Sequence, residues 1–373
     1  MVNEKRIIDQ FLQLVQIDSE TSKERKIADY LIHVMESIGL DVIEDKSNDK
    51  SRHEAGNLIC KLEGNSSDTE TIFFTAHMDT VAPGKSIKPV IRENMILSDG
   101  TTILGADDKA GIAAIIECIH VLKEMETSHG DLYFVIMSGE ESGLVGSRYF
   151  DSSLLPADYG YALDSNGQVG QVMTAAPAQS KLYASIKGKA AHAGVNPEKG
   201  VSAISITAKA ITKMPLGRVD EETTANIGSF EGKGPTNVVC DEVLLIAEAR
   251  SLSENKLKKQ VHNMIEALEH TATIMGGEVE VNVKSMYPSY HFKSNDKVVE
   301  TVVNAIAGIG RKPILKTSGG GSDANHLSGK GIPTVNLAIG YENIHTKNER
   351  MPIQELVKIP ELMVEIIKQT RID

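Results

Sequence analysis

Short apolar runs that alternate with helical patterns constrain the fold of this chain more than any other feature. Helical patterns occur near 110–125 and 354–369. Strands buried on both faces and separated by helices are typical of parallel sheets, so we predict an α/β protein with a mixed, mostly parallel sheet covered by helices on both faces. The runs with the length and composition of buried strands are NLICKL (57–62), TIFFTA (71–76), DLYFVIM (131–137), YGYALD (159–164) and TVNLAI (334–339).

The middle of the chain has a different order of elements. It reads as strand, helix, two strands, helix and strand, which is the βαββαβ order of ferredoxin-like domains. A length of 373 residues is enough for two domains. We therefore expect one domain at 176–287, inserted into another formed by 1–175 and 288–373. The segments of the insert are 180–188, 200–213, 225–230, 243–251, 253–277 and 278–286.

Composition narrows the possible functions. The net charge of −12 and the lack of a Lys/Arg cluster disfavour nucleic acid and membrane surfaces as partners. No apolar run reaches membrane-spanning length, and the N-terminal MVNEKRIIDQFLQLVQ is charged and amphipathic, unlike a signal peptide. Cys60, Cys118 and Cys240 show no CxxC spacing and are expected to be buried, reduced thiols. A cytoplasmic protein is expected.

Polar residues that suit a metal follow the predicted strands. The carboxyl ends of parallel strands meet at one edge of a sheet, where ligands bind. The loop LGADDKAG (104–111), just before a helix, is expected at the same edge. The residues that should converge there are His77, Asp79, Asp107, Asp108, Glu140, Glu141, Asp164 and His345.

These residue types match the needs of a two-metal hydrolytic site. Zinc takes histidine nitrogen and carboxylate oxygen, and such a site also needs a bridging carboxylate and a separate acid–base group. The neighbours Glu140 and Glu141 should diverge at a strand end, so that one binds metal while the other faces water and substrate. His77-x-Asp79 adds an acid that can orient a ligating imidazole. An acidic pair alone is more often a helix start, but the joint arrangement favours a metal site.

The motifs also resemble, in order, those of the two-zinc metallopeptidase family that includes peptidase T, glutamate carboxypeptidase, acetylornithine deacetylase and aminoacylase. The match spans almost the whole chain, and LGADDKAGIA is most similar to the peptidase T-like members. The matching stretches are HMDTV (77–81), DGTTILGADDKAG (99–111), MSGEESG (137–143), ALDSNG (162–167), KAAHAG (189–194), SGGGSDANH (318–326) and NIHTKNE (343–349).

The resemblance implies two zinc ions per chain and a role for each matching residue. Glu140 would be the general base and later the acid, and Asp79 would orient His77. A cis peptide bond is implied between Asp107 and Asp108. Manganese or cobalt would also suit these ligands. One ion would be bound by His77 and Asp164, the other by Glu141 and His345, with Asp107 bridging the two.

The inserted domain resembles the family's lid and dimerisation domain, which implies a homodimer. His192 would bind the oxyanion of the tetrahedral intermediate, within its own subunit or across the dimer. Asn237 and Arg250 match lid positions that contact polar groups of the substrate. Gly320, in a run of three glycines, is expected to offer a backbone N–H to substrate.

The main functional prediction is an aminopeptidase that acts on short peptides, because Asp at position 164 resembles the family's aminopeptidases more than its carboxypeptidases. A deacylase or carboxypeptidase would share the metal chemistry and differ in its pocket. An inactive binding or assembly protein would be favoured by loss of a ligand or of Glu140, and none is lost. The segment TSGGGSD and the residues Ser165 and Asn166 depart from peptidase T, so a strict tripeptide preference is not carried over.

The remaining histidines receive no role. His53 and His129 are placed in polar loops. His120, His262 and His270 lie on helical patterns, and His291 and His326 lie nearer the predicted site in sequence.

Overall fold

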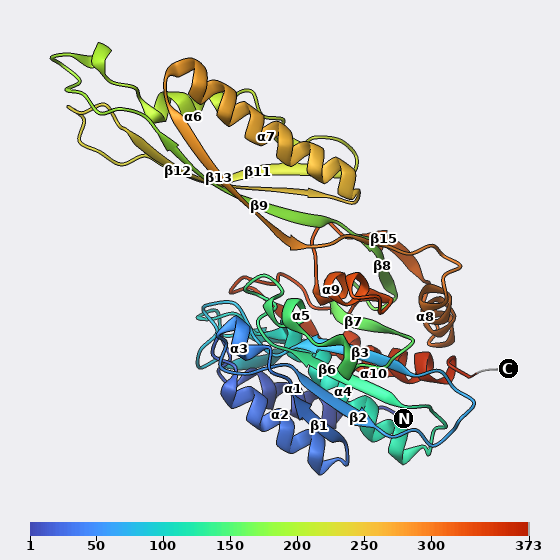
Figure 1. Ribbon diagram of the computed structural model, residues 1–373. Helices are drawn as coiled ribbons and strands as arrows, with labels where there is room; N and C mark the ends of the chain where they lie inside the picture. The colour runs from blue at the N-terminus through green and yellow to red at the C-terminus, as the bar shows by residue number, and fades with distance from the viewer. Residues whose placement is uncertain (372–373) are drawn as a thin grey trace. The chain divides into compact units, whose positions relative to one another are not determined.

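The computed structural model describes residues 1–371. Within them the chain forms two compact units (Figure 1). Unit 1 contains Met1–Ala175 and the chain from His291 onward, and unit 2 is Ala176–Tyr290. The chain returns to unit 1 a few residues beyond the predicted boundary at 287–288.

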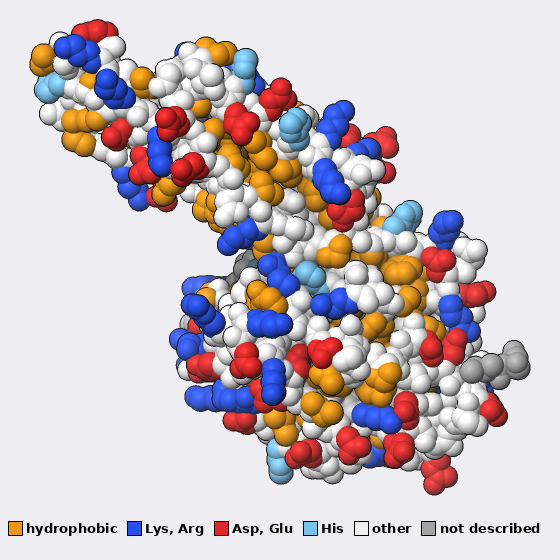
Figure 2. Space-filling model, in the orientation of Figure 1, with side chains coloured by type: hydrophobic (Ala, Val, Ile, Leu, Met, Phe, Trp, Pro, Cys, Tyr) orange, Lys and Arg blue, Asp and Glu red, His pale blue; other side chains and the backbone are white. Residues whose placement is uncertain are grey.

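Charged side chains of both signs cover the surface. Acidic and basic groups are interspersed over the face drawn in Figure 2. Within residues 1–371, no helix is both long enough and apolar enough to cross a membrane.

Unit 2 is an antiparallel sheet with the order β10-β11-β12-β9-β13. The order of its longer strands and its helices is the predicted ferredoxin-like βαββαβ. The sequence prediction missed only the short strand β10 and a 3₁₀ turn among the described elements of this unit. The elements are β9 (Ala178–Lys187), η2 (Pro197–Lys199), α6 (Ala203–Ile211), β10 (Gly217–Arg218), β11 (Thr223–Glu231), β12 (Glu242–Ser251), α7 (Glu254–Met275) and β13 (Glu278–Tyr287).

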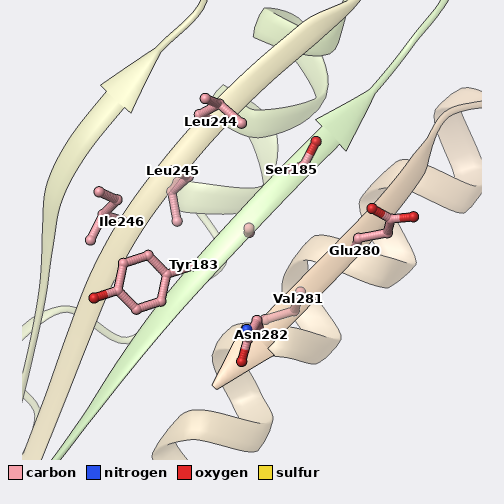
Figure 3. Close-up of a pocket in the computed structure, with 9 residues that line it drawn as sticks. Tyr183, Ser185, Leu244, Leu245, Ile246, Glu280, Val281 and Asn282 are labelled. Atoms are coloured by element: carbon pink, nitrogen blue, oxygen red, sulfur yellow. The ribbon is translucent and has the colours of Figure 1, made fainter. Parts of the chain in front are cut away.

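The helices α6 and α7 cover one face of this sheet, and the other face is open. Burial alternates along β12, where Leu245 is 1% exposed and its neighbours Leu244 and Ile246 are 53% and 41% exposed. Figure 3 shows these side chains with Tyr183 of β9 beside a groove of about 380 Å³ on the sheet. Unit 2 therefore carries an apolar surface on the face away from its helices.

Unit 1 is built on a mixed sheet of nine strands within the described residues, in the order β1-β2-β6-β3-β7-β16-β8-β14, with β15 paired to β8. The central strands β6, β3, β7 and β16 run parallel to one another. A small sheet of order β17-β5-β4 lies apart from it. The strands are β1 (Asp41–Glu44), β2 (Leu58–Leu62), β3 (Ile72–His77), β4 (Pro89–Arg92), β5 (Met95–Ser98), β6 (Leu132–Met137), β7 (Tyr159–Ser165), β8 (Gln171–Ala176), β14 (Tyr290–His291), β15 (Ile314–Thr317), β16 (Thr334–Ala338) and β17 (Arg350–Pro352).

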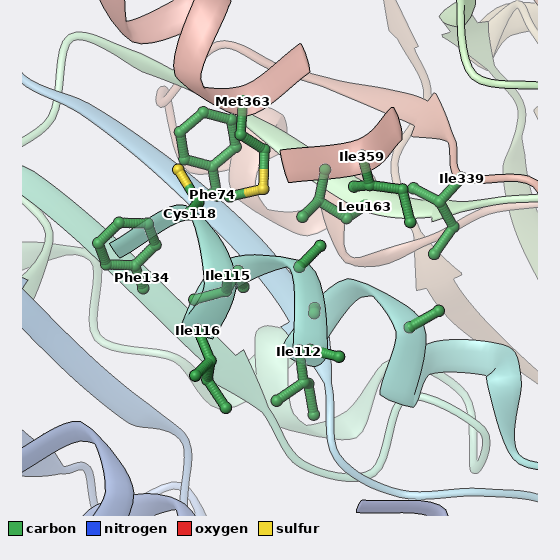
Figure 4. Close-up of a cluster of buried hydrophobic side chains, with 14 of the residues drawn as sticks. Phe74, Ile112, Ile115, Ile116, Cys118, Phe134, Leu163, Ile339, Ile359 and Met363 are labelled. Carbon is green, nitrogen blue, oxygen red and sulfur yellow. The ribbon is translucent and has the colours of Figure 1, made fainter. Parts of the chain in front are cut away.

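Both faces of this sheet are buried, which explains the continuous apolar runs in the sequence. All residues of β3 and β6 are buried. Phe74 packs with α4 and α10 on one face (Figure 4), whereas its neighbour Phe73 packs with Tyr133 and Leu327 in a separate cluster. The predicted fold class is confirmed. The helices are α1 (Glu4–Val15), α2 (Arg25–Ser37), α3 (Asn48–Ser51), α4 (Ala106–Glu124), α5 (Val145–Tyr149), η1 (Ser152–Leu154), α8 (Lys297–Gly308), α9 (Asp323–Gly329) and α10 (Ile353–Lys368).

The cysteines differ in burial. Cys60 and Cys118 are buried, as predicted, and Cys118 belongs to the core drawn in Figure 4. Cys240 is partly exposed, so the prediction of a buried thiol is wrong for this residue. It lies in the loop before β12, outside the apolar core of unit 2.

Candidate metal centre

Three neighbouring strands of unit 1 carry predicted ligands at their carboxyl ends. His77 is the last residue of β3, Asp164 lies near the end of β7, and the turn with Glu140 and Glu141 follows β6. These strands are adjacent in the order β6-β3-β7 and run parallel. Their ends therefore bring the side chains to one edge of the sheet, as the sequence pattern predicted.

Asp107, at the start of α4, faces two histidines with different oxygens. Its Oδ1 lies 3.1 Å from His77 Nε2, and its Oδ2 lies 3.2 Å from His345 Nε2. His77 Nε2 is also 3.8 Å from Asp164 Oδ1, and His345 Nε2 is 3.0 Å from Glu141 Oε1. The described residues thus include two ligand groups, each with its atoms within 4.8 Å, that share only Asp107. Two metal sites that share a bridging carboxylate would need ligands placed in this way.

The hydrogen bonds and pKa values of the two histidines indicate that this cluster of side chains can bind cations. Its Nδ1 lies 2.9 Å from the backbone oxygen of Asp79, which can only accept, so Nδ1 carries the hydrogen. In the neutral ring, Nε2 then presents a lone pair to the carboxylates of Asp107 and Asp164. Burial alone would lower the pKa of His77, but hydrogen bonds to Asp107 and Asp79 raise it well above its ordinary value. Hydrogen bonds to Asp107 and Glu141 likewise raise the pKa of His345 to about 10. The residues fit positive ions between them.

A buried glutamate holds the loop that carries Asp107. Glu349 is 1% exposed, and its carboxylate accepts hydrogen bonds from the backbone N–H groups of Leu104 and Gly105 at 2.8 Å and of Asp107 at 3.0 Å. Burial raises the pKa of Glu349 to about 7. These three hydrogen bonds fix the position of the backbone at Asp107.

The peptide bond between Asp107 and Asp108 is cis, as the resemblance implied. Asp108 turns toward β3, where its Oδ2 accepts the backbone N–H of His77 at 3.1 Å. Adjacent aspartates therefore do different work: one faces the histidine rings and the other holds the end of the strand.

Asp79 makes more contacts than the single role predicted for it. Its carboxylate oxygen lies 3.5 Å from His77 Nδ1, farther than its backbone oxygen. The same carboxylate accepts the backbone N–H groups of Glu140 at 3.0 Å and Glu141 at 3.2 Å. Asp79 thereby ties the end of β3 to the turn after β6. Its assignment as the group that orients His77 stays a prediction.

The two glutamates of this turn contact different groups. Glu141 reaches His345, while Glu140 lines a cavity of about 160 Å³. Burial, followed by the charge of Asp164, raises the pKa of Glu140 well above its ordinary value. Glu140 also has an oxygen within 4.8 Å of ligand atoms of His77 and Glu141, so the division of the pair into base and ligand stays a prediction.

Two residues that sequence reasoning missed hold Asp164. The Asn336 side chain donates to the backbone oxygen of Asp164 at 2.6 Å and accepts its N–H at 3.0 Å. The Tyr341 hydroxyl donates to Asp164 Oδ1 at 3.1 Å. Asn336 interrupts the apolar run TVNLAI, and a polar residue inside a buried strand is the signal that could have found it. The cavity beside Glu140 is also lined by Asp107, Asp164, Ser165, Asn166, Ser318, Gly321, Asn336, Tyr341, Ile344 and His345.

The other predicted substrate contacts are divided between the units. In unit 2, His192 is exposed and pairs with Val238, next to Asn237, whose backbone oxygen accepts the N–H of Ala193 at 2.8 Å. Arg250 of β12 donates to Glu248 at 2.8 Å. The roles of His192, Asn237 and Arg250 stay predictions.

In unit 1, the N–H of Gly320 is already engaged. It donates to Ser318 Oγ at 3.1 Å, and this hydroxyl donates back to the Gly320 oxygen at 2.9 Å. The next glycine, Gly321, lines the cavity. This geometry disfavours the N–H of Gly320 as a donor to substrate.

Comparison with known proteins agrees with this geometry. The model of peptidase family M20/M25/M40 matches residues 73–369, which include every predicted metal ligand. The chain belongs to this family. The resemblance drawn from the motifs is therefore confirmed, and with it the prediction of a metallopeptidase.

Three similar proteins cover almost the whole chain. A curated relative, the uncharacterized protein YqjE of Bacillus subtilis (strain 168), is 58% identical over 99% of both chains. The crystal structure of aminopeptidase PepT from Bacillus cereus ATCC 10987 is 55% identical, with a TM-score of 0.94 over 99% of both chains. A tripeptidase structure from Staphylococcus aureus subsp. aureus Mu50 is 47% identical, with a TM-score of 0.96 over 99% of this chain and 98% of that one.

Proposed function

We propose that this protein is a dinuclear zinc aminopeptidase that releases the N-terminal residue of short peptides. The observation that carries the proposal is Asp107, whose two oxygens each face a different histidine at about 3 Å. The similarity to an aminopeptidase and a tripeptidase supports the choice of substrate.

The distances support an assignment of the ligands to two ions. His77 and Asp164 would hold one, Glu141 and His345 the other, and Asp107 both. When bound, the ions supply Lewis-acid polarisation of a peptide carbonyl and lower the pKa of a bound water.

Proton transfer falls to Glu140. A carboxylate with a raised pKa can take a proton from water and later return it to the leaving amine nitrogen. Asp79 supports this step because its carboxylate fixes the backbone of the turn. His192, on unit 2, would donate a hydrogen bond to the developing oxyanion.

Among the described residues, the lining of the cavity lacks the arginine that usually recognises a C-terminal carboxylate. Asp107, Glu140 and Asp164 contribute carboxylates, and no Lys or Arg is among the described residues that line it. Because Asp107 and Asp164 are the proposed metal ligands and Glu140 the proposed base, these carboxylates are assigned to the metal ions and to proton transfer.

Three forms of one tripeptide separate the possible activities. Zinc-loaded protein is incubated with the free, N-acetylated and C-amidated peptide, and products are read by mass spectrometry with a chelator control. We expect chelator-sensitive loss of the N-terminal residue, blocked by acetylation. Release of acetate or of the C-terminal residue would move the assignment to a deacylase or carboxypeptidase. The amidated peptide reports whether a substrate carboxylate is needed, the contact assigned to Arg250.

The identity and number of the ions need their own measurement. Histidine and carboxylate ligands also accept manganese or cobalt. Metal analysis of protein purified without added metal should find about two zinc ions per chain, because two of the candidate ligand groups of the described residues share Asp107. Purified protein without zinc would overturn the zinc assignment.

A homodimer through unit 2 is part of the proposal. The open sheet face carries exposed Tyr183, Leu244 and Ile246 around the groove in Figure 3. Apolar patches of this kind often mark interaction sites. Sedimentation of the full chain should give twice the monomer mass, and a monomer at micromolar concentration would remove the dimer. A cytoplasmic location stays a proposal from the cysteine pattern, to be tested by cell fractionation.

A further inference from the structure

A hydrogen-bonded network of three polar side chains contacts the turn that carries Glu140 and Glu141. Its members come from three separate segments: Glu24 precedes α2, His53 follows α3, and Ser142 follows β6. Glu24 Oε1 lies 2.8 Å from His53 Nδ1, and His53 Nε2 lies 3.2 Å from Ser142 Oγ. None of the three belongs to the candidate ligand groups.

This side-chain network extends from the protein interior to its surface. The side chain of Glu24 is fully buried, that of His53 is 7% exposed, and Ser142 is exposed. The sequence placed His53 in a polar loop without a role, and in the structure it lies in the loop after α3 with its side chain largely buried. A buried carboxylate requires close donors, and Glu24 Oε1 has two, the His53 ring at 2.8 Å and the backbone N–H of Ser22 at 2.6 Å. The hydrogen bond to Glu24 raises the pKa of His53.

The His53 ring packs directly against the turn. A Cβ added to Gly139 would lie 2.6 Å from His53 Nδ1, which is too close for any side chain. Gly139 also has a φ of +64°, a conformation that glycine adopts at no steric cost. The residue immediately before Glu140 is therefore a glycine because the imidazole occupies the space beside it.

Counting protons gives the direction of each hydrogen bond. Ser142 Oγ donates to the backbone oxygen of Gly139 at 3.1 Å, and a hydroxyl has one proton. His53 Nε2 must then donate to Ser142 while Nδ1 donates to Glu24. All three bonds coexist only when the imidazole carries both protons, as its buried carboxylate partner favours. The network then has hydrogen bonds from His53 to Glu24, from His53 to Ser142, and from Ser142 to the backbone oxygen of Gly139.

We infer that Glu24, His53 and Ser142 are positioning residues that fix the turn through groups that Asp79 does not bind. Asp79 accepts hydrogen bonds from the backbone N–H groups of Glu140 and Glu141. The network instead binds the backbone oxygen of Gly139 and the side chain of Ser142. The inference rests on the proposed function for the roles of Glu140 and Glu141. It adds a network that sets the distance between the base and the metal ligand.

The test uses Ser142, the exposed member of the network, where a substitution does not disturb the core. Ser142→Ala should lower kcat roughly tenfold, as expected for loss of one hydrogen bond to a charged group, and leave KM unchanged. It should weaken binding of the more loosely held zinc ion by a similar factor, measured by competition with a chromophoric chelator. Ser142→Thr, which restores the hydroxyl, should recover both values.

Ser37→Ala is the matched control. Ser37 is exposed in the same unit and donates to the backbone oxygen three residues earlier, Val34, as Ser142 does to Gly139. It should change neither kcat nor zinc affinity. If Ser142→Ala behaves like this control, the inference is overturned.

A double-mutant cycle checks that His53 and Ser142 act together in one network. His53→Leu with Ser142→Ala should lose less than the sum of the two single losses, because without His53 the serine keeps its bond to Gly139 but has lost its own donor. Additive losses would overturn the inference. Zinc affinity needs no turnover, so an absence of peptidase activity in the wild-type protein would reject the proposed function and leave the affinity result to decide this inference.

Discussion

The sheet of unit 1 is buried on both faces, whereas the sheet of unit 2 is covered on one. In β3 the neighbours Phe73 and Phe74 are both fully buried, in clusters on opposite faces. In β12 the neighbours Leu244 and Leu245 are 53% and 1% exposed. A doubly covered sheet holds its strand ends in fixed positions, which a multi-ligand metal site requires. A singly covered sheet leaves a broad surface for binding. The difference suggests that unit 1 supplies the chemistry and unit 2 supplies contacts.

The largest expected effect tests whether the chemistry is confined to unit 1. Glu140→Gln should lower kcat by roughly 10³-fold or more, because the amide cannot take a proton from water. Metal analysis should still find two ions per chain. Loss of an ion would show that Glu140 is the ligand and Glu141 the base.

The next effect tests double burial itself. Phe73→Ala and Phe74→Ala should each lower the free energy of unfolding by about 3–5 kcal/mol, since each removes a buried ring and leaves a cavity. Chemical denaturation followed by circular dichroism measures both. Unequal losses, with one near zero, would show that one face of β3 is not packed in solution.

A contribution of unit 2 to the chemistry would break the comparison in its simple form. His192→Ala should lower kcat about 10²-fold if the imidazole binds the oxyanion, with metal content unchanged. An unchanged rate would remove His192 from the mechanism and leave unit 2 with binding alone. Steady-state kinetics on the cleaved tripeptide decides.

A smaller effect sharpens the account of the metal centre. Glu349→Gln keeps the shape of the side chain but leaves one oxygen to serve the three N–H groups of the Asp107 loop. Zinc affinity should fall about 10–100-fold, as for other residues that support ligands without touching metal. Competition with a chelator measures it. Wild-type affinity would show that the rest of the loop suffices to hold Asp107.

The smallest effect concerns the open face of unit 2. Leu245→Ala should cost about 2–4 kcal/mol of stability, whereas Leu244→Ala on the same strand should change it by less than about 0.5 kcal/mol in a monomer. Thermal unfolding of the two variants gives the contrast. A large loss for Leu244→Ala that depends on protein concentration would show that a second copy covers this face.

Sequence reasoning succeeded where the signal is local and periodic. The runs around Phe74 and Phe134 were predicted as strands because continuous apolar stretches bounded by polar residues are typical of doubly buried strands. The convergence of the candidate ligands could be predicted because parallel strands end at one edge. The short strands β1, β4, β5, β8, β14 and β15 were missed, since most are too short or too exposed to show a pattern.

The supporting contacts of the site could not be predicted in the same way. Glu349 bonds to backbone groups more than 240 residues earlier in the chain. Glu24 and Ser142 are joined only by His53, and no spacing in the sequence indicates this contact. Hydrogen bonds from a side chain to distant backbone have no repeat or motif, so they become visible only when the fold is known.

The sheet order of unit 2 has an evolutionary consequence. Its first strand, β9, and its last, β13, are neighbours, with Gln179 paired to Tyr287. The two crossings between units thus lie one strand spacing apart, about 4.8 Å. A gene that lost the codons for 178–287 would need only a short turn to rejoin the chain, and a gene that gained such a segment would leave the host sheet undisturbed. The order of the strands therefore allows unit 2 to be added or removed at neighbouring points of the chain.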